Sequence, residues 1–387
     1  MSMSKQPIYL DHAASTFVAE PVLAEMVEAL KQSQGNPSSI HRQGRKTKVM
    51  LEASRRRVAE MMHASTSEIV FTSGGTEANN AVFWCCYKDL GIKTFISSPL
   101  EHPSVIRSLE NLKRYFGVMV IFVRVDREGH PDLSHLEELL DQHDHALVSL
   151  MHANNEIGTL LPAKDVSALC HKAGALFHSD TVQTIGKYHM DFSSGLFDFA
   201  VASGHKFHGP QGVGFLYVRP GLQIKPFIDG GSQERGLRAG TENLAGVVGL
   251  SAALAYCYAD LDASQRHIAG LKDHLIASLK EAFPSVVFNG DITSGSAYSI
   301  LNFSLPIPVD TAILLSRLDM EGICVSSGSA CSSGSVKGSH VLTALGVSDD
   351  MPSLRVSFSR ENTRGDVDKL VQVLKAVVKE SQHHSSF

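Results

Sequence analysis

The chain has 387 residues, of which 43% are hydrophobic and 19% are charged, and its formal net charge is −5. This composition is typical of a globular protein with an extensive core, and the acidic balance argues against direct binding to nucleic acid or to a membrane surface. No apolar run is long enough to span a bilayer, and the first residues lack the apolar core of a secretion signal. We therefore expect a cytoplasmic protein with reduced thiols, made of two domains or of one large domain with an appendage.

The first predicted element is a helix at residues 20–32, which carries apolar residues on one face. From about residue 68 to 218, short β-rich runs such as EIVFTS, KTFISS, MVIFVRV and FDFAVAS alternate with helical patterns. Continuous apolar runs of this length favour strands in a sheet that is buried on both faces. Their alternation with helices indicates an α/β fold with a mainly parallel central sheet.

The pattern changes after residue 242. The segment ENLAGVVGLSAALAYCYADL predicts a long, mostly buried helix, and a second helix is expected at about 263–282. Four short strands follow, VVFN, YSILNFS, ICVSS and LRVSFS, with helices at 310–321 and 366–380 between and after them. We predict a large α/β domain of residues 15–255 and a smaller α+β domain formed by residues 1–14 and 256–387.

Polar segments follow the predicted strands of the large domain. They are GGTEANN, PLEHPSV, NNEIG, SDTVQ and GHKFHGPQGVG. In α/β sheets, ligands bind beyond the carboxyl ends of the strands, so these segments are expected to meet at one site. Each also has an ordinary interpretation, because Gly75 and Thr76 could form a simple turn with a helix cap, and His102 could be a satisfied loop histidine.

Two charged residues in these segments require an explanation. Asp180 stands in an apolar setting, where an unpaired carboxylate is costly. Lys206 stands between two histidines beyond a buried strand, and a lysine in a desolvated site can form a Schiff base. Pyridoxal phosphate needs such a lysine, an acid for its ring nitrogen and a cup for its phosphate. The cup could be formed by Gly75, Thr76, Ser203 and His205.

The cysteines and histidines indicate no metal site. The chain has 6 cysteines without a C-x-x-C pair, and its 19 histidines are scattered without an H-E-x-x-H pattern. Cys331 is unusual because it lies in VSSGSACSSGS, a composition typical of a flexible linker. A linker has no packing use for cysteine, which is normally buried.

In these motifs, in their order and spacing over nearly the whole chain, the sequence resembles the cysteine desulfurases of the class V aminotransferase family. The segments that carry the resemblance are YLDHAAST, GNPSSIH, FTSGGTEANN, LEHPSV, HANNEIG, HSDTVQ, SGHKFHGPQGVG, GGSQERGLRAGTEN, SSGSACSSG and LRVSFSR. The resemblance implies the fold of the pyridoxal-phosphate-dependent transferases (aminotransferase fold type I). His12 and Ser232 depart from common family patterns without touching an implied role.

The resemblance also implies roles in holding the cofactor. Lys206 would hold pyridoxal phosphate covalently, Asp180 would pair with its ring nitrogen, and Gln183 would bond its phenolic oxygen. His102 would stack on the ring and act in proton transfer. The phosphate would be held by Gly75, Thr76, Ser203 and His205, and by Thr241 of the neighbouring subunit, which implies a homodimer.

The remaining implied roles concern the substrate. Asn155 and Arg355 would hold the carboxylate of L-cysteine, for which a guanidinium fork is suited, and Asn155 would also contact the cofactor. Cys331, on a mobile loop of about residues 326–338, would attack the substrate sulfur as a thiolate, leaving alanine and a Cys331 persulfide. The sulfur would then pass to an acceptor protein such as an iron–sulfur scaffold, a tRNA-thiolation enzyme or a DNA sulfur-modification protein, and the sequence does not choose among them.

Two alternatives stay open. A selenocysteine lyase or another pyridoxal-phosphate-dependent aminotransferase of the same fold would share Lys206 and Asp180 without needing Cys331 on such a loop. A non-catalytic subunit that kept the fold should have lost at least one of Lys206, Asp180, His102 and Cys331, and all of these are present.

Overall fold

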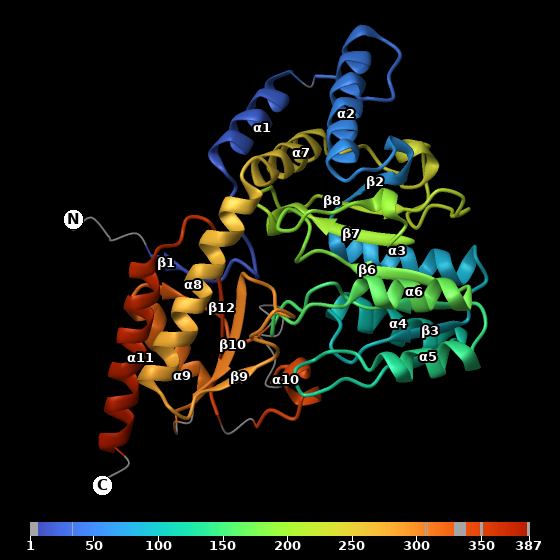
Figure 1. The fold of residues 1–387 in the computed structure, drawn as a ribbon. Helices are drawn as coiled ribbons and strands as arrows, with labels where there is room; N and C mark the ends of the chain where they lie inside the picture. The colour runs from blue at the N-terminus through green and yellow to red at the C-terminus, as the bar shows by residue number, and fades with distance from the viewer. Residues whose placement is uncertain are drawn as a thin grey trace.

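The computed structural model describes residues 7–32, 34–305, 307, 309–328, 338–348 and 351–384, with side chains described up to residue 380. Figure 1 shows a larger part built on a central sheet and a smaller part that contains both the first strand and the last helix. The predicted mainly parallel α/β architecture is confirmed.

The central sheet has seven strands in the order β2-β8-β7-β6-β5-β3-β4. Strand β8 is antiparallel to both of its neighbours, and the other pairs are parallel. The strand bounds, in sheet order, are β2 (Ile69–Thr72), β8 (Gly214–Val218), β7 (Phe199–Ser203), β6 (Leu176–Asp180), β5 (Ala146–Ser149), β3 (Thr94–Ser97) and β4 (Met119–Phe122).

Strands β2, β5, β7 and β8 are buried along their whole length, and β3 and β6 are buried except at their first residue, which explains these continuous apolar runs. The prediction of burial on both faces is wrong for β4. Strand β4 is one of the two edge strands, and Met119 and Phe122 at its ends are 49% and 43% exposed, whereas β2 at the opposite edge is buried throughout.

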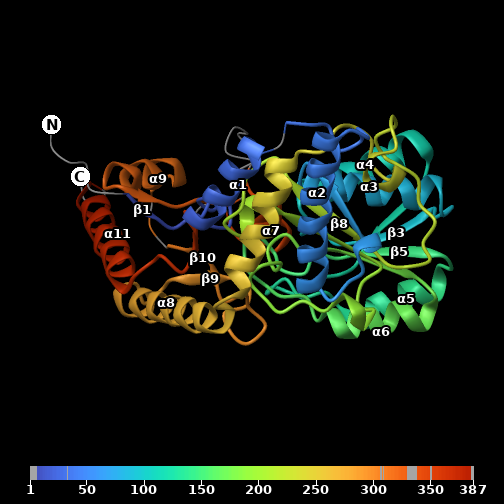
Figure 2. The same cartoon turned by 90° about the horizontal axis from the view of Figure 1, so that it is seen from above.

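Helices cover both faces of this sheet, as the view from above shows (Figure 2). One hydrophobic cluster joins the sheet to α3 and α4, and another joins it to α2, α5, α6 and α7. Helix α7 also packs closely along α1 and α2. The bounds are α1 (Glu20–Gln32), α2 (Arg42–Met61), α3 (Gly75–Lys88), α4 (Pro103–Phe116), α5 (Leu133–Gln142), α6 (Ala163–Ala173) and α7 (Leu244–Tyr258), with short 3₁₀ helices η1 (Thr66–Glu68), η2 (Phe192–Ser194), η3 (Gly204–Lys206) and η4 (Gln233–Gly236).

The smaller part has its own core between helices and an antiparallel sheet of order β12-β10-β9. Strand β1 pairs in parallel with β11, so the start of the chain belongs to this part. The bounds are β1 (Ile8–Tyr9), β9 (Val287–Asn289), β10 (Ile300–Ser304), β11 (Ile323–Cys324) and β12 (Ser353–Ser357), and α8 (Leu261–Ala282), α9 (Thr311–Met320), α10 (His340–Ala344) and α11 (Arg364–His384).

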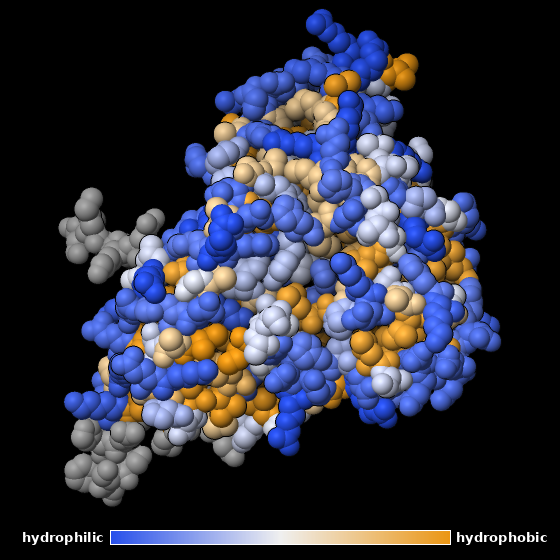
Figure 3. All heavy atoms as spheres, in the orientation of Figure 1, coloured by the Kyte–Doolittle hydropathy of each residue, from blue (hydrophilic) through white to orange (hydrophobic). Residues whose placement is uncertain are grey.

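The predicted domain boundary at residue 255 falls in the last turn of α7, and the division into two domains stays a prediction. Within the described residues, no individual helix combines the length and the apolar character needed to cross a membrane. Helices α7 and α8 meet that criterion only when taken together, and they are bent by 73° relative to each other. On the face drawn in Figure 3 the surface is mostly hydrophilic, with scattered hydrophobic patches.

Candidate active site

The predicted site residues meet in a cavity of about 200 Å³ at the carboxyl ends of β6 and β7. Among the described residues, every predicted cofactor and substrate residue lines it except Thr241. The lining consists of Ala13, Ala14, Gly75, Thr76, Asn79, His102, Ser104, Met151, Asn155, Asp180, Val182, Gln183, Ser203, His205, Lys206 and Arg355.

The N-terminus of α3 opens into this cavity. Gly74, the residue before the helix, has a φ of 150° and makes no side-chain cap hydrogen bond. The first backbone N–H groups of a helix have no partner within the helix and attract an anion. A side chain at position 75 would place its Cβ 2.8 Å from Cγ2 of Val182 on the cavity wall, so glycine is required for this close approach.

A chain of hydrogen bonds joins Asp180 to His102. Nδ2 of Asn79 donates to Oδ2 of Asp180 at 2.8 Å and to Oγ of Ser104 at 2.9 Å. Oγ of Ser104 lies 2.7 Å from Nδ1 of His102, which also accepts from the Ser104 N–H at 3.1 Å. Burial lowers the pKa of His102, with Asp180 opposing and Lys206 adding to the effect. The imidazole is therefore neutral at physiological pH, with its proton on Nε2.

Asn79 and Ser104 are functional positions that the sequence analysis missed. Asn79 lies four residues after Gly75, so both fall on the same face of α3, the face that meets the cavity. That spacing was the available signal. Ser104 lies in the first turn of α4, for which His102 is the N-cap. No sequence spacing marks Ser104, because its contact with Asn79 joins two different helices.

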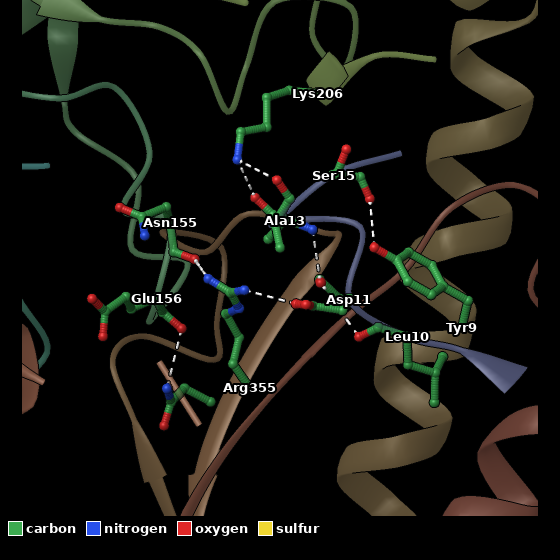
Figure 4. Close-up of polar contacts among 12 residues, drawn as sticks. Tyr9, Leu10, Asp11, Ala13, Ser15, Asn155, Glu156, Lys206 and Arg355 are labelled. Carbon is green, nitrogen blue, oxygen red and sulfur yellow. Dashed lines mark hydrogen bonds and ion pairs between the residues drawn. The ribbon is translucent and has the colours of Figure 1, made fainter. Parts of the chain in front are cut away.

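The amine of Lys206 lies against the segment that follows β1. Nζ donates to the carbonyl oxygens of Ala13 at 2.7 Å and of Ala14 at 2.8 Å (Figure 4). The N–H of Ala13 donates in turn to Oγ of Ser357 on β12 at 2.8 Å. Burial lowers the pKa of the neighbouring His205 to about 4, and the charge of Lys206 adds to this effect. His205 is therefore neutral beside the lysine.

Arg355 on β12 is buried, with a side chain that is 1% exposed, and is no surface charge. Nη1 donates to the carbonyl oxygen of Asn155 at 2.8 Å, and Nη2 donates to Oδ1 of Asp11 at 2.7 Å (Figure 4). Its buried Nε has no hydrogen-bond partner among the described residues. Nη1 and Nη2 each carry a second hydrogen that these two contacts do not use, and Arg355 lines the cavity.

Gln183 connects the cavity to a residue that the sequence analysis did not single out. Its Nε2 donates to the carbonyl oxygen of Ala13 at 2.9 Å, and its Oε1 accepts from Nζ of Lys187 at 3.0 Å. Burial of the Lys187 amine, together with the charge of Lys206, lowers its pKa to about 7.

Thr241 does not reach this cavity. It lines a separate cavity of about 160 Å³ together with Thr72, Ser73, Arg238 and other residues near the start of α7. Its expected role in the site of a neighbouring subunit stays a prediction.

Cys331 lies outside the described residues, as does most of the predicted loop of 326–338. The flanks of that segment are described, and both meet the buried carboxylate of Glu156. Oγ of Ser339 donates to Oε2 of Glu156, and a Cβ at Gly328 would lie 2.9 Å from the same oxygen. Both flanks therefore lie next to Asn155 on the cavity wall.

Within the described part of the chain, one group of side chains has the spacing of metal ligands: Glu128, His130 and Asp291. None of them lines the cavity. Asp291 is already engaged by the backbone N–H and hydroxyl of Thr293.

Comparison with known proteins supports the relationship that these motifs imply. The family model Aminotransferase class-V matches residues 8–370. The chain is 40% identical to cysteine desulfurase 2 of Trichormus variabilis, over 98% of this chain and 95% of that protein. It is 38% identical to cysteine desulfurase IscS of Dictyoglomus turgidum, over 97% and 95%. A solved NifS-like protein superposes with a TM-score of 0.89 at 34% identity, covering 97% of this chain and 100% of that one. This chain therefore belongs to the class V aminotransferase family, whose members are pyridoxal-phosphate-dependent enzymes.

Proposed function

We propose that this chain is a pyridoxal-phosphate-dependent cysteine desulfurase, which removes sulfur from L-cysteine to give L-alanine and a persulfide on Cys331. The observation that carries the proposal is that one cavity is lined by Lys206, Asp180 and the N-terminus of α3. Relatives named cysteine desulfurases, at 38% and 40% identity over almost the whole chain, support the choice of reaction.

The residues of the cavity fit pyridoxal phosphate. The α3 N-terminus offers uncapped N–H groups to a phosphate. Asp180 is 5% exposed, and Nδ2 of Asn79 and the N–H of Val182 donate to its two oxygens, which fixes the position of an acidic group suited to pair with the ring nitrogen. Oδ1 of Asn79 is buried without a hydrogen-bond partner among the described residues, so the pocket also has an unused acceptor.

We assign the holding roles accordingly. Lys206 would hold the cofactor covalently through its amine, and Asp180 would pair with the ring nitrogen. The phosphate would lie at Gly75 and Thr76, with Ser203 and His205 beside it. When bound, pyridoxal phosphate withdraws electrons from the α-carbon of an attached amino acid, which weakens the Cα–H and Cβ–S bonds.

The chain supplies the remaining chemistry. Arg355 and Asn155 would orient the substrate by its carboxylate. Lys206 would accept the proton from Cα through its amine once that amine no longer holds the cofactor, and neutral His102 holds a further proton on Nε2. The Cys331 thiolate would attack the substrate sulfur, so that an S–S bond forms as the Cβ–S bond breaks. Proton return to carbon completes alanine, and the sulfur stays on Cys331 as the persulfide.

The test is a single-turnover reaction of the purified, cofactor-loaded chain with L-cysteine. We expect equal amounts of alanine and of Cys331 persulfide, the latter located by mass spectrometry of an alkylated digest. Lys206→Ala should form neither. Alanine without persulfide on any cysteine would contradict the desulfurase reaction. Turnover of selenocysteine that greatly exceeds turnover of cysteine would favour the lyase alternative.

The proposal also covers the oligomeric state, the cellular location and the sulfur acceptor. We infer a homodimer in which Thr241 reaches the partner's site, a cytoplasmic location, and an acceptor protein that takes the sulfur from Cys331. The candidate acceptors include an iron–sulfur scaffold and a tRNA-thiolation enzyme. Capture of proteins by the persulfide-loaded chain, followed by identification of the labelled recipient, distinguishes them.

A further inference from the structure

Lys187 is placed behind the cavity by a tight turn after β6. Gly186 has a φ of 77°, in the left-handed region that favours glycine. A Cβ there would lie 2.5 Å from Cβ of Phe207, the residue that follows Lys206. The carbonyl oxygen of Lys187 accepts from Nε2 of Gln265 at 2.6 Å and from the hydroxyl of Tyr298 at 2.9 Å. The backbone of Lys187 is therefore fixed from the smaller part of the molecule.

The amine of Lys187 has no evident stabilising role. Among the described residues, no carboxylate lies within ion-pair distance of its Nζ. A cation in the interior without such a partner costs stability. The titratable and charged groups around it are mostly basic or neutral, and they come from four parts of the chain: Lys206, Cys257, Arg355, His12, His205 and His208.

The hydrogen bond from Lys187 to Gln183 helps to set the orientation of the Gln183 side-chain amide. In its protonated form a lysine amine only donates, and the atom that it meets at 3.0 Å is Oε1 of Gln183. Nε2 is then turned toward the carbonyl oxygen of Ala13, which also accepts from Lys206. Nε2 carries two hydrogens, so one remains for an oxygen acceptor in the cavity that Gln183 lines.

We propose that Lys187 is a positioning residue of the cofactor site, which acts through Gln183 by holding its amide with the N–H side toward the phenolic oxygen of pyridoxal phosphate. Without this bond, only the contact from Nε2 to the carbonyl oxygen of Ala13 opposes a turn of the amide that would bring Oε1 toward the ligand, where two oxygens would face each other. The inference rests on the proposed function for the identity of the cofactor. Lys187 would then strengthen the binding of a ligand only if that ligand carries the phenolic oxygen.

The experiment compares two ligands and uses binding as the readout. Chain stripped of cofactor is titrated with pyridoxal phosphate and with an analogue that lacks the phenolic oxygen. We expect Lys187→Met to weaken binding of pyridoxal phosphate by about tenfold, the effect of one hydrogen bond, and to change binding of the analogue less than about twofold. Lys187→Arg, which keeps a donor, should restore most of the difference, and exposed Lys172→Met should behave as wild type.

Two further comparisons test whether Lys187 acts through Gln183 and whether its role is more than structural. In a Gln183→Ala background, Lys187→Met should have no additional effect if it acts through that amide. Equal weakening of both ligands would overturn the inference and leave Lys187 a structural residue, as would unchanged binding of both. Lys187→Leu replaces Lys187→Met if the methionine variant does not fold. A wild-type chain that binds neither ligand would overturn the proposed function and this inference together, whereas a wild type that binds both equally overturns this inference alone.

Discussion

Nη2 of Arg355 lies 2.7 Å from Oδ1 of Asp11, so the arginine proposed to take the substrate carboxylate already has a carboxylate partner within the protein. The Arg355 side chain is 1% exposed and that of Asp11 is 16% exposed, so solvent screens the pair weakly. Asp11 satisfies the buried guanidinium, and if Arg355 takes the substrate carboxylate as proposed, Asp11 would compete with it for the same charge.

Asp11→Asn tests this competition. The amide keeps an oxygen that can accept from Nη2 but removes the negative charge, so we expect KM for L-cysteine to fall by about tenfold or less, the effect of weakening one charged contact. Steady-state kinetics provide the measurement. Arg355→Lys, which loses the planar fork, should raise KM instead. A rise in KM for Asp11→Asn would mean that Asp11 positions Arg355 and does not compete with substrate.

Cys331→Ala tests the sulfur-transfer step. The variant should keep the yellow absorbance of bound cofactor, because Cys331 is assigned no part in holding it, and should lose sulfide release from L-cysteine. Cys170→Ala is the matched control, since Cys170 is a buried residue of α6 that does not line the cavity. Sulfide release by Cys331→Ala at the wild-type rate would exclude the persulfide mechanism.

Asn79→Ala tests the support of Asp180. Removal of Nδ2 takes a hydrogen bond from Asp180 and another from Ser104, so the Asp180 side chain and, through Ser104, His102 are less well held. We expect cofactor affinity to fall by about tenfold, measured by fluorescence titration of the stripped chain. The adjacent Asn80→Ala is the control, because Nδ2 of Asn80 donates to the carbonyl oxygen of Thr76 in its own helix. Equal affinities of the two variants would contradict the prediction.

The buried ion pair of Arg55 and Glu234 predicts a large stability effect. Both side chains are 2% exposed, and Nη1 and Nη2 of Arg55 lie 2.7 Å and 2.8 Å from the two oxygens of Glu234. Arg55→Met should lower the free energy of unfolding by about 3–5 kcal/mol, because it leaves a buried carboxylate without its partner. Denaturant titration provides the measurement. The exposed pair of Arg57 and Glu25 is the control, and Arg57→Met should cost less than about 1 kcal/mol.

Buried histidines predict a loss of stability in mild acid. Burial lowers the pKa of His178 to about 3, and His152 and His12 are lowered to about 4 by the same cause. Because these values lie below the unfolded value of about 6.5, the unfolded chain binds protons first as pH falls. Stability is therefore fully present above about pH 6.5 and is lost as pH drops toward 4.

His178→Gln removes one of these titrating side chains and so measures its contribution to the pH dependence. His178 is 0% exposed, and its Nε2 has no hydrogen-bond partner among the described residues. The variant should show a dependence of unfolding free energy on pH that is shallower by about 1.4 kcal/mol per pH unit between pH 6 and pH 4. Denaturant titrations across that range measure the slope. An unchanged slope would mean that His178 takes up its proton in the folded state.

Much of the site followed from local sequence. The motifs at the strand ends identified Lys206, Asp180, Gly75, Thr76 and Ser203, because parallel strands bring their carboxyl ends to one edge of the sheet. The continuous apolar runs identified the buried strands of the central sheet, because burial on both faces requires apolar residues throughout. The edge position of β4 could not be read from its sequence, because MVIF is as apolar as an interior strand.

The contacts between distant segments were decided only by the tertiary structure. Asp11 and Arg355 are separated by 344 positions, and Ala13 and Lys206 by 193. No periodicity or motif spacing relates such residues, because their approach depends on how the smaller part of the molecule packs against the large sheet. Sequence by itself determined which chemical groups this protein carries and the fold that holds them. The tertiary structure determined which groups face one another across the cavity, and so placed Lys187 behind Gln183 and Asp11 against Arg355.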